Sequence, residues 1–383
     1  MRQKKSWFIV GVTLAVIAVA LVLAPGAWAA STFKVLHRFT GAFIGGTDAA
    51  QPEAGLIFDA AGNVYGTTAR GGGSVSCGLG CGTVFRLTPN PDGTWTESVL
   101  HSFDEEIDGE SPFAGLIFDA VGNLYGTTAG GGGPARNGTV FKLTPNPDGS
   151  WTESVLHSFR LKRGADGAHP FGGLIFDAAG NLYGVTVAGG ASTNCPSSNT
   201  GCGVVFKLTP NSNGSWTERV IHSFCSVPNC ADGGGPIAGL IFDAAGNLYG
   251  TTQGGGSAGN GTVFKLTPNS DGSWTESVLH SFTGADGHNP FAGLIFDAAG
   301  NLYGTTNAGG ASTNCSNGCG VVFKLTPNSD GTWTERVIHT FGSLPAVFPD
   351  AGLVLDAAGN LYGTTLLCVL SGGCGTVFKM TPN

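Results

Sequence analysis

The amino-acid sequence predicts an all-β chain that folds as a six-bladed β-propeller, with four antiparallel strands in each blade. Three observations lead to this prediction. The segment Gly293-Leu-Ile-Phe-Asp-Ala-Ala-Gly-Asn-Leu-Tyr-Gly-Thr-Thr306 recurs six times with small changes. A second pair of strand-like runs follows each of the first five copies. The last copy lacks its fourth run, and an isolated run of that kind precedes the first copy.

Four strands are expected in one copy of the repeat. The first is Gly-Leu-Ile-Phe-Asp and the second is Asn-Leu-Tyr-Gly-Thr-Thr, joined by a turn whose glycine supplies the positive φ of a tight hairpin. The third is Thr139–Thr144 and the fourth is Trp151–Phe159. They are joined by Pro-Asn-Pro-Asp-Gly, a sequence rich in turn-forming residues. After the N-terminal segment, no window predicts an amphipathic helix.

The repeat has a period of 54 to 66 residues, and copies start near residues 55, 115, 173, 239, 293 and 352. Strand-only repeats of this length are typical of propellers, whose blades differ mainly in their loops. We expect one domain over residues 31–383. The run Phe33–Phe39 matches a fourth strand, so we expect it to complete the last blade and close the ring. A linear solenoid would explain the repeats but not these complementary ends.

Residues 1–30 predict a secretory signal peptide. Lys4 and Lys5 precede the apolar run Trp7–Leu23, and Ala27-Trp28-Ala29 provides a small-x-small cleavage site. The alternative is a retained membrane anchor, because the apolar run approaches the length of a spanning helix. The cleavage site favours removal. We therefore expect an exported protein, periplasmic or extracellular, whose mature part does not span the membrane.

The ten cysteines fall into five sequence-neighbouring pairs, and blades that lack one member lack both. Such pairing favours disulfides, which an exported protein can form. A metal site is the alternative, but no histidine or acidic ligands accompany the pairs. The predicted disulfides are Cys77–Cys81, Cys195–Cys202, Cys225–Cys230, Cys315–Cys319 and Cys368–Cys374.

The net charge of −8 lacks the basic excess that nucleic-acid binding requires, so no nucleic-acid partner is expected. A weakly acidic, soluble chain is expected to be a monomer with a protein or glycan ligand.

In each complete repeat a basic residue on the third strand precedes a glutamate on the fourth by eleven positions, as in Lys142 and Glu153. We expect these residues to lie opposite each other as cross-strand pairs.

Residues that recur in every blade are expected to serve the fold. Six histidines occupy one fourth-strand position, namely His37, His101, His157, His222, His280 and His339. We interpret them as packing or hydrogen-bonding residues, and the motif aspartates as caps of their own turns. The loops that vary lie on one face, formed by the second-to-third loops and the links between blades. Function on a rigid scaffold concentrates in such loops, so we expect the binding site there.

The links between blades repeat the pattern Asp-Gly-x-x-Pro four times, beginning at Asp108, Asp166, Asp232 and Asp286. The structural interpretation is a turn that returns the chain to the axis. The functional alternative is a partial ring of carboxylates at the channel mouth, able to bind calcium.

Residues that are not repeated are better candidates for specificity. They include Glu105, Glu106, Lys162 and three phenylalanines (Phe113, Phe171, Phe291) that can line the mouth or pack in the core. No catalytic residue is assigned, the metal ligands are left open, and calcium is the one cofactor considered. The candidate ligand-binding residues are Asp108, Glu110, Asp166, His169, Asp232, Asp286, His288, Arg160 and Arg163.

The two recurring halves, Gly-Leu-Ile-Phe-Asp-Ala-Ala-Gly-Asn-Leu-Tyr-Gly-Thr-Thr and Gly-Thr-Val-Phe-Lys-Leu-Thr-Pro-Asn, resemble the GloVer tandem-repeat family of exported bacterial proteins. The resemblance covers nearly all of residues 33–383. It implies an exported repeat protein of unassigned function. Members often end in a surface-sorting anchor, a feature not seen before Asn383. The Asp-x-x-Gly-Asn-x-Tyr hairpin also resembles NHL-type and lactonase-like six-bladed propellers, at the level of the blade.

The sequence favours a binding and interaction scaffold that uses the loop-rich face, because it shows no distinct set of acid, base and nucleophile. The alternative is a metal-dependent hydrolase, lactonase or lyase with its site at the channel mouth. A structural role in the cell envelope is a third option.

Overall fold

The computed structural model describes residues 34–41, 48–161, 166–196, 200–342, 346–366 and 375–382. The chain divides into two compact units, Met1–Arg38 and Phe39–Asn383. The predicted signal segment, residues 1–30, lies outside the described residues, so its cleavage stays a prediction. The description below concerns the second unit.

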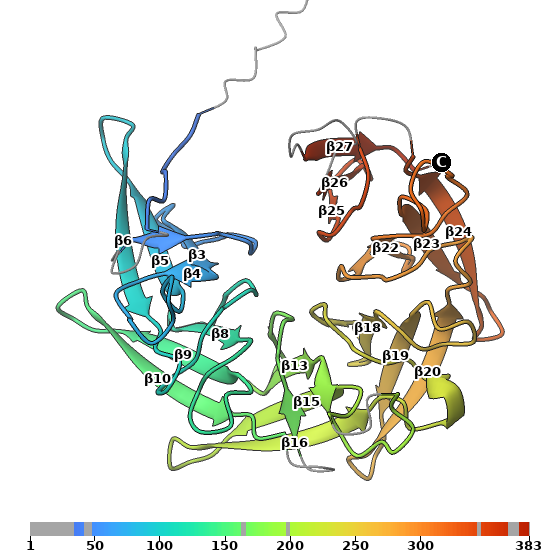
Figure 1. The fold of residues 1–383 in the computed structure, drawn as a ribbon, viewed down its shortest axis with the longest axis horizontal. Coiled ribbons are helices and arrows are strands. Elements are labelled where there is room, and N and C mark those ends of the chain that lie inside the picture. Colours follow the sequence, from blue (N-terminus) through green and yellow to red (C-terminus); the bar gives the residue numbers. More distant parts are fainter. Residues whose placement is uncertain are drawn as a thin grey trace, which may run out of the picture. The chain divides into compact units, whose positions relative to one another are not determined.

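Six antiparallel sheets follow one another along this unit as the blades of a β-propeller, as predicted (Figure 1). Blades one to five have four strands and blade six has three. In Figure 1 the fourth strands lie at the periphery. The strands of blades one to three are β2 (Ile57–Phe58), β3 (Val64–Thr68), β5 (Thr83–Pro89), β6 (Trp95–Ser102); β7 (Ile117–Phe118), β8 (Leu124–Thr128), β9 (Thr139–Pro145), β10 (Trp151–Ser158); and β12 (Ile175–Phe176), β13 (Leu182–Thr186), β15 (Val204–Pro210), β16 (Trp216–Ser223). Those of blades four to six are β17 (Ile241–Phe242), β18 (Leu248–Thr252), β19 (Thr262–Pro268), β20 (Trp274–Ser281); β21 (Ile295–Phe296), β22 (Leu302–Thr306), β23 (Val321–Pro327), β24 (Trp333–Thr340); and β25 (Val354–Leu355), β26 (Leu361–Thr365), β27 (Thr376–Met380).

The predicted closing strand is absent from the described residues. Residues 34–40 form no strand, residue 33 lies outside the description, and blade six has the order β25-β26-β27. Phe39 nevertheless packs like a fourth-strand phenylalanine, because its ring meets that of Phe85 edge-on at 4.9 Å, as Phe103 meets Phe141. This contact is local in sequence, whereas pairing with β27 would close a loop of nearly the whole chain at a larger entropy cost.

The motif aspartates cap their own turns, as predicted. In blade two the Asp119 carboxylate accepts hydrogen bonds from the backbone N–H of Val121 and Asn123, at 3.0 and 2.9 Å. It also accepts one from the Asn123 side chain at 2.6 Å and one from the Tyr125 hydroxyl at 3.1 Å. Burial raises the pKa of Asp119, but these hydrogen bonds outweigh it and lower the pKa below its ordinary value. The buried tyrosine is thereby anchored to the turn of its own blade.

The core is made between blades rather than inside them. One cluster combines Tyr125 and Phe159 of blade two with Leu182 and Phe206 of blade three. Similar clusters join blades one and two, three and four, four and five, and five and six. Each sheet therefore depends on its neighbours for burial of its apolar faces.

The expected cross-strand pairs between basic residues and glutamates are wrong by one register position. Lys142 lies opposite Ser154, and Glu153 lies opposite Leu143. A one-residue shift places a side chain on the other face of the sheet, so the two charges point apart. The ammonium group of Lys142 instead lies over the Tyr125 ring, 5.7 Å from its centroid.

The loop-rich face is held together by backbone pairing. The link that enters a blade pairs with the loop between that blade's second and third strands. In blade three, β11 (Gly167–Ala168) pairs with β14 (Ala188–Gly189), and in blade one, β1 (Ala49–Ala50) pairs with β4 (Arg70–Gly71). Single bridges take the same place in blades two, four and five, between Glu110 and Gly130, Gly234 and Gly254, and His288 and Ala308.

Four of the five predicted disulfides are present in this face, and no described cysteine is free. They are Cys77–Cys81, Cys195–Cys202, Cys225–Cys230 and Cys315–Cys319. The fifth pair, Cys368 and Cys374, lies outside the described residues. Within the described ranges the one helical element is the 3₁₀ turn η1 (Pro228–Cys230). The described residues contain no helix long and apolar enough to cross a bilayer.

Candidate functional site

The fourth-strand histidines reach the interface with the next blade because of a β-bulge. The pairing of β10 with β9 shifts between Val155 and His157, so Leu156 is an extra residue. Side chains alternate along a strand, and one extra residue turns His157 to the face that carries Leu156. The His157 ring then meets that of Phe159, which packs on Phe206 of blade three. Blades one, three, four and five contain the same shift.

The link aspartates meet these histidines. The carboxylate of Asp166 lies 3.2 Å from Nε2 of His157 and accepts a hydrogen bond from the backbone N–H of Arg160 at 2.9 Å. It therefore closes the start of the link loop and orients the imidazole ring. The distances from imidazole Nε2 to carboxylate are 2.8 Å for His101–Asp108, 3.2 Å for His157–Asp166, 4.0 Å for His222–Asp232 and 3.1 Å for His280–Asp286.

A glutamate from the following blade completes each junction. Trp216 of blade three packs edge-on against Tyr125 of blade two, with ring centroids 6.3 Å apart. Glu218 is two residues further along β16 and lies on the same face, so it points back toward blade two. Its Oε1 atom is buried and has no hydrogen-bond partner. The same is true of Oε1 in Glu153, Glu276 and Glu335.

Of the four junctions between blades one and five, two hold the three side chains in tight clusters. One ligand-type atom from each of His157, Asp166 and Glu218 lies within 4.8 Å of the other two. His280, Asp286 and Glu335 form the second cluster with the same spacing. We call these the blade 2–3 cluster and the blade 4–5 cluster. Each gathers one imidazole nitrogen and two carboxylate groups from three separate segments.

The electrostatics of the junctions favour uncharged forms. Burial and the charge of Asp166 together raise the pKa of Glu218 to about 7. The other three glutamates have pKa values raised to about 7 for the same reasons, namely Glu153, Glu276 and Glu335. Burial lowers the pKa of His222 and His280, and the neighbouring aspartates oppose that shift.

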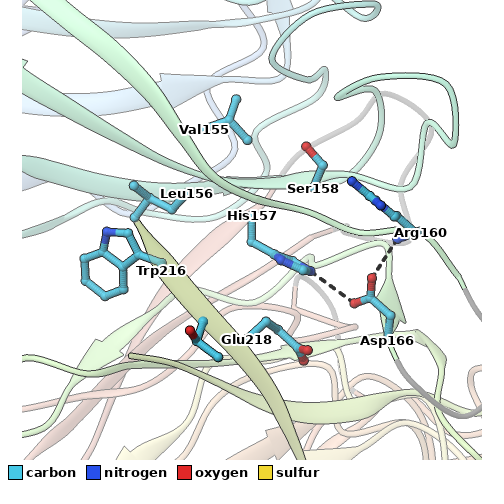
Figure 2. Close-up of a pocket in the computed structure, with 9 residues that line it drawn as sticks. Val155, Leu156, His157, Ser158, Arg160, Asp166, Trp216 and Glu218 are labelled. Carbon is cyan, nitrogen blue, oxygen red and sulfur yellow. Dashed lines mark hydrogen bonds and ion pairs between the residues drawn. The ribbon is translucent and has the colours of Figure 1, made fainter. Parts of the chain in front are cut away.

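The blade 2–3 cluster opens into a pocket of about 550 Å³ (Figure 2). Figure 2 shows His157, Asp166 and Glu218 converging on one wall, with Arg160 beside Asp166. Val155, Leu156 and Trp216 form the apolar part of the lining. An ion or small polar group can therefore reach the cluster from solvent.

The four link aspartates are placed in four separate junctions. No group of described ligand atoms within 4.8 Å contains two of them. Asp108 and Asp232 cap the links to blades two and four by accepting hydrogen bonds from the backbone N–H of Asp104 and Ser226, at 2.7 Å each. The turn interpretation of the link motif therefore accounts for their contacts.

The other described residues of the predicted site lie in the loop-rich face at separate places. Glu110 lies on the link into blade two, where burial and the charge of Glu105 raise its pKa. The ring of His169 lies 2.9 Å from the carbonyl oxygen of Ala129 through Nδ1. His288 is half-buried at its bridge, Arg160 is exposed, and Arg163 lies outside the described residues.

A non-repeated ion pair joins two loops of this face. The Arg136 guanidinium lies 2.5 Å from the Glu105 carboxylate and 3.7 Å from that of Glu106. Phe113 and Phe171 from successive links stack with centroids 5.3 Å apart. The ion pair joins the link into blade two to that blade's second-to-third loop, and the stacked rings join two successive links.

The junction glutamates are the functional candidates that sequence reasoning missed. The fixed spacing of eleven residues predicted that these glutamates pair with the basic residues of the third strand. In the structure the two kinds of side chain lie on opposite faces of the sheet. The available signal was the regular co-occurrence of Trp-x-Glu and a histidine in the same strand. Only the bulge, which the sequence does not mark, brings the histidine of one blade to the glutamate of the next.

The fold and these repeated junctions define a β-propeller repeat protein. The chain belongs to the Gloeobacter/Verrucomicrobia repeat family, whose model matches residues 26–198 and 192–383. A search of curated proteins finds no match.

Solved structures with a similar fold include PorZ, a bacterial surface component of the type-IX secretion system of Porphyromonas gingivalis. It is 15% identical with a TM-score of 0.46, over 82% of this chain and 39% of the PorZ chain. This chain therefore spans well under half the length of PorZ. A luciferin-regenerating enzyme is 14% identical with a TM-score of 0.46, over 87% of this chain and 92% of the enzyme.

Proposed function

We propose that this propeller is an exported binding scaffold that presents its loop-rich face to a protein or glycan ligand. The observation that carries the proposal is the common backbone pairing beneath loops of unlike sequence. In every blade from one to five the entering link pairs with the second-to-third loop. Loops fixed in this way display varied side chains with little ordering cost on binding, which favours recognition.

The inner strands support a scaffold rather than a catalytic channel. A Cβ atom added to Gly115 would lie 3.3 Å from the carbonyl oxygen of Gly55, and one added to Gly239 would lie 3.3 Å from that of Gly173. Backbone therefore meets backbone where successive first strands begin. These glycines carry no side chains where the first strands begin, whereas the loops present many side chains for contact.

The four disulfides support the proposed location. Disulfides persist in oxidising compartments such as the periplasm or the extracellular space. Each closes a short loop on the face proposed to bind, with sequence separations of 4 to 7 residues.

The test is a binding screen with matched variants of the two faces. The probes are a glycan array and a displayed peptide library, applied to chain 31–383 in its oxidised form. Arg136→Gln and Arg160→Gln alter the loop-rich face, while Pro147→Ala alters an exposed turn on the opposite face. We expect at least one loop variant to weaken a selected hit about tenfold and the turn variant to have no effect.

Two results would contradict the scaffold proposal. One is the absence of any saturable hit from both probe sets. The other is a hit that Pro147→Ala weakens while both loop variants bind normally.

A further inference from the structure

The blade junctions, rather than the loop-rich face, gather titratable side chains from three separate segments. We propose that the blade 2–3 cluster and the blade 4–5 cluster are binding sites for a first-row transition-metal dication of the Zn²⁺ type. This inference is independent of the scaffold proposal, because it concerns side chains between blades.

The first support is convergence. In the blade 2–3 cluster, His157 comes from the fourth strand of blade two, Asp166 from the link and Glu218 from the fourth strand of blade three. Their potential ligand atoms lie within 4.8 Å of one another. Tetrahedral zinc ligands bound at about 2.0–2.2 Å are separated by less than 4 Å, so small side-chain movements suffice to close the set around an ion.

The second support is an unmet polar group. The buried Oε1 atom of Glu218 has no hydrogen-bond partner, and neither has that of Glu335 in the blade 4–5 cluster. A buried carboxylate without a partner costs stability, because it loses its hydration and gains nothing in return. A bound cation would satisfy this oxygen and neutralise the charge that two neighbouring carboxylates place in one small volume.

The donor set indicates the kind of metal. One imidazole nitrogen with two carboxylates suits zinc and related first-row ions, whereas calcium takes oxygen donors in sets of six to eight. Asp166 lies 3.2 Å from His157 Nε2. Metal binding would use that nitrogen in its unprotonated form and leave the proton on Nδ1.

The repeat supplies internal comparisons. At the junction of blades three and four, His222 lies 4.0 Å from Asp232, and the trio with Glu276 is not among the groups within 4.8 Å. Asp232 Oδ2 accepts hydrogen bonds from the backbone N–H and the hydroxyl of Ser226, as Asp286 Oδ1 does from those of Thr283. The same residue types are therefore present there without the same convergence.

The experiment is a Zn²⁺ titration of the oxidised chain 31–383, freed of any affinity tag, by isothermal calorimetry at about pH 8, where carboxylates are ionised and metal ligands are available. We expect the blade 2–3 cluster and the blade 4–5 cluster to contribute one site each. Glu218→Gln and Glu335→Gln should each remove one site, and the double variant should remove both. Glu276→Gln is the matched control and should retain the wild-type number of sites.

A second measurement separates loss of the sites from loss of the fold. Excess Zn²⁺ should raise the Tm of the wild-type chain, because the ion binds the native state, and Ca²⁺ should raise it less. The double variant should unfold cooperatively without metal and show no Zn²⁺-dependent rise in Tm. The proposal is overturned if the double variant binds Zn²⁺ as the wild type does, or if Glu276→Gln removes a site as Glu218→Gln does. It is also overturned if the wild-type chain binds no Zn²⁺.

Discussion

At the scale of single residues, repetition has two meanings in this chain. Tyr125 and Asp119 recur in every blade because each blade needs an anchored turn, and their contacts lie within one hairpin. The glutamate represented by Glu153 recurs in five blades, yet the charges that act on Glu153 lie outside its own sheet, on Asp108 and His101. Identical side chains can thus serve one blade or join two.

The junction glutamates make stability depend on pH. Burial and Asp108 raise the pKa of Glu153 to about 7, with His101 opposing, so the native state retains a proton that the unfolded chain releases at lower pH. Stability from this residue is therefore lost as pH rises from the unfolded pKa toward about 7. We expect Glu153→Gln to match the wild type at about pH 5 and to exceed it by about 1 kcal/mol at about pH 8, a value reduced for solvent screening.

Urea denaturation at both pH values measures this effect. Ser154→Ala changes an exposed neighbour on the same strand and should behave as the wild type does. If Glu153→Gln and the wild type lose stability in parallel as pH rises, the raised pKa of Glu153 is not the cause of that loss.

Removal of a turn-capping carboxylate should be costly in the inner hairpin. Asp119→Ala removes the acceptor for Val121, Asn123 and the hydroxyl of Tyr125, which is only 4% exposed. Leaving a buried hydroxyl without a partner costs about 1–3 kcal/mol, so we expect a loss of about 2–3 kcal/mol. The comparison is Asp148→Ala, in an exposed outer turn, which should lose much less. Equal losses in chemical denaturation would show that the tyrosine contact contributes little.

At the scale of elements, the hairpins could be predicted from sequence but their fine register could not. Turn residues and alternating apolar residues marked all four strands of a blade. The bulge at Leu156 has no sequence signal, because the extra residue is an ordinary apolar side chain. Glu153 lies opposite Leu143 because the pairing of the third and fourth strands is shifted by one residue from the predicted register. The junction clusters depend on the bulge, on the register and on contacts between blades. The sequence therefore predicted the strands and links that carry these residues, but not that the residues meet.

The second strand tolerates no side chain at its central glycine. Gly126 pairs with Phe141, and a Cβ atom there would lie 2.6 Å from the Phe141 ring. Gly126→Ala should therefore overpack the sheet and cost about 1–3 kcal/mol in the free energy of unfolding. Gly55→Ala is the matched control, since nothing lies within 4 Å of its added Cβ. A thermal or urea transition unchanged by Gly126→Ala would contradict the packing described for this strand.

At the scale of the whole molecule, apolar clusters join the blades, and each disulfide closes a short loop. The six-bladed fold followed from the count of repeats, while the closing strand at residues 33–39 did not appear in the described residues. That element depends on pairing the two ends of the chain, which no local pattern can guarantee. The cysteine pairing was predictable because the two cysteines of each pair are close in sequence and because blades that lack one member lack both.

All ten cysteines should be oxidised in the exported protein. Thiol titration of the denatured, non-reduced chain is expected to detect no free thiol, and mass spectrometry of its digest should link neighbouring cysteines. Each disulfide closing so short a loop contributes about 2 kcal/mol, so reduction should lower the Tm. This measurement also covers Cys368 and Cys374. Detection of free thiols in an exported sample would refute the oxidised assignment.

The pairing of each link with the loop of the blade that follows has an evolutionary consequence. β11 precedes blade three in sequence and pairs with β14 within it, so the heritable module is a link together with its blade. A gene duplication that copied a sheet alone would leave its loop without a partner. Duplications that keep the link could lengthen or shorten the array while preserving each internal boundary. Divergence can then accumulate in the loop sequences, because their backbone positions are inherited with the module.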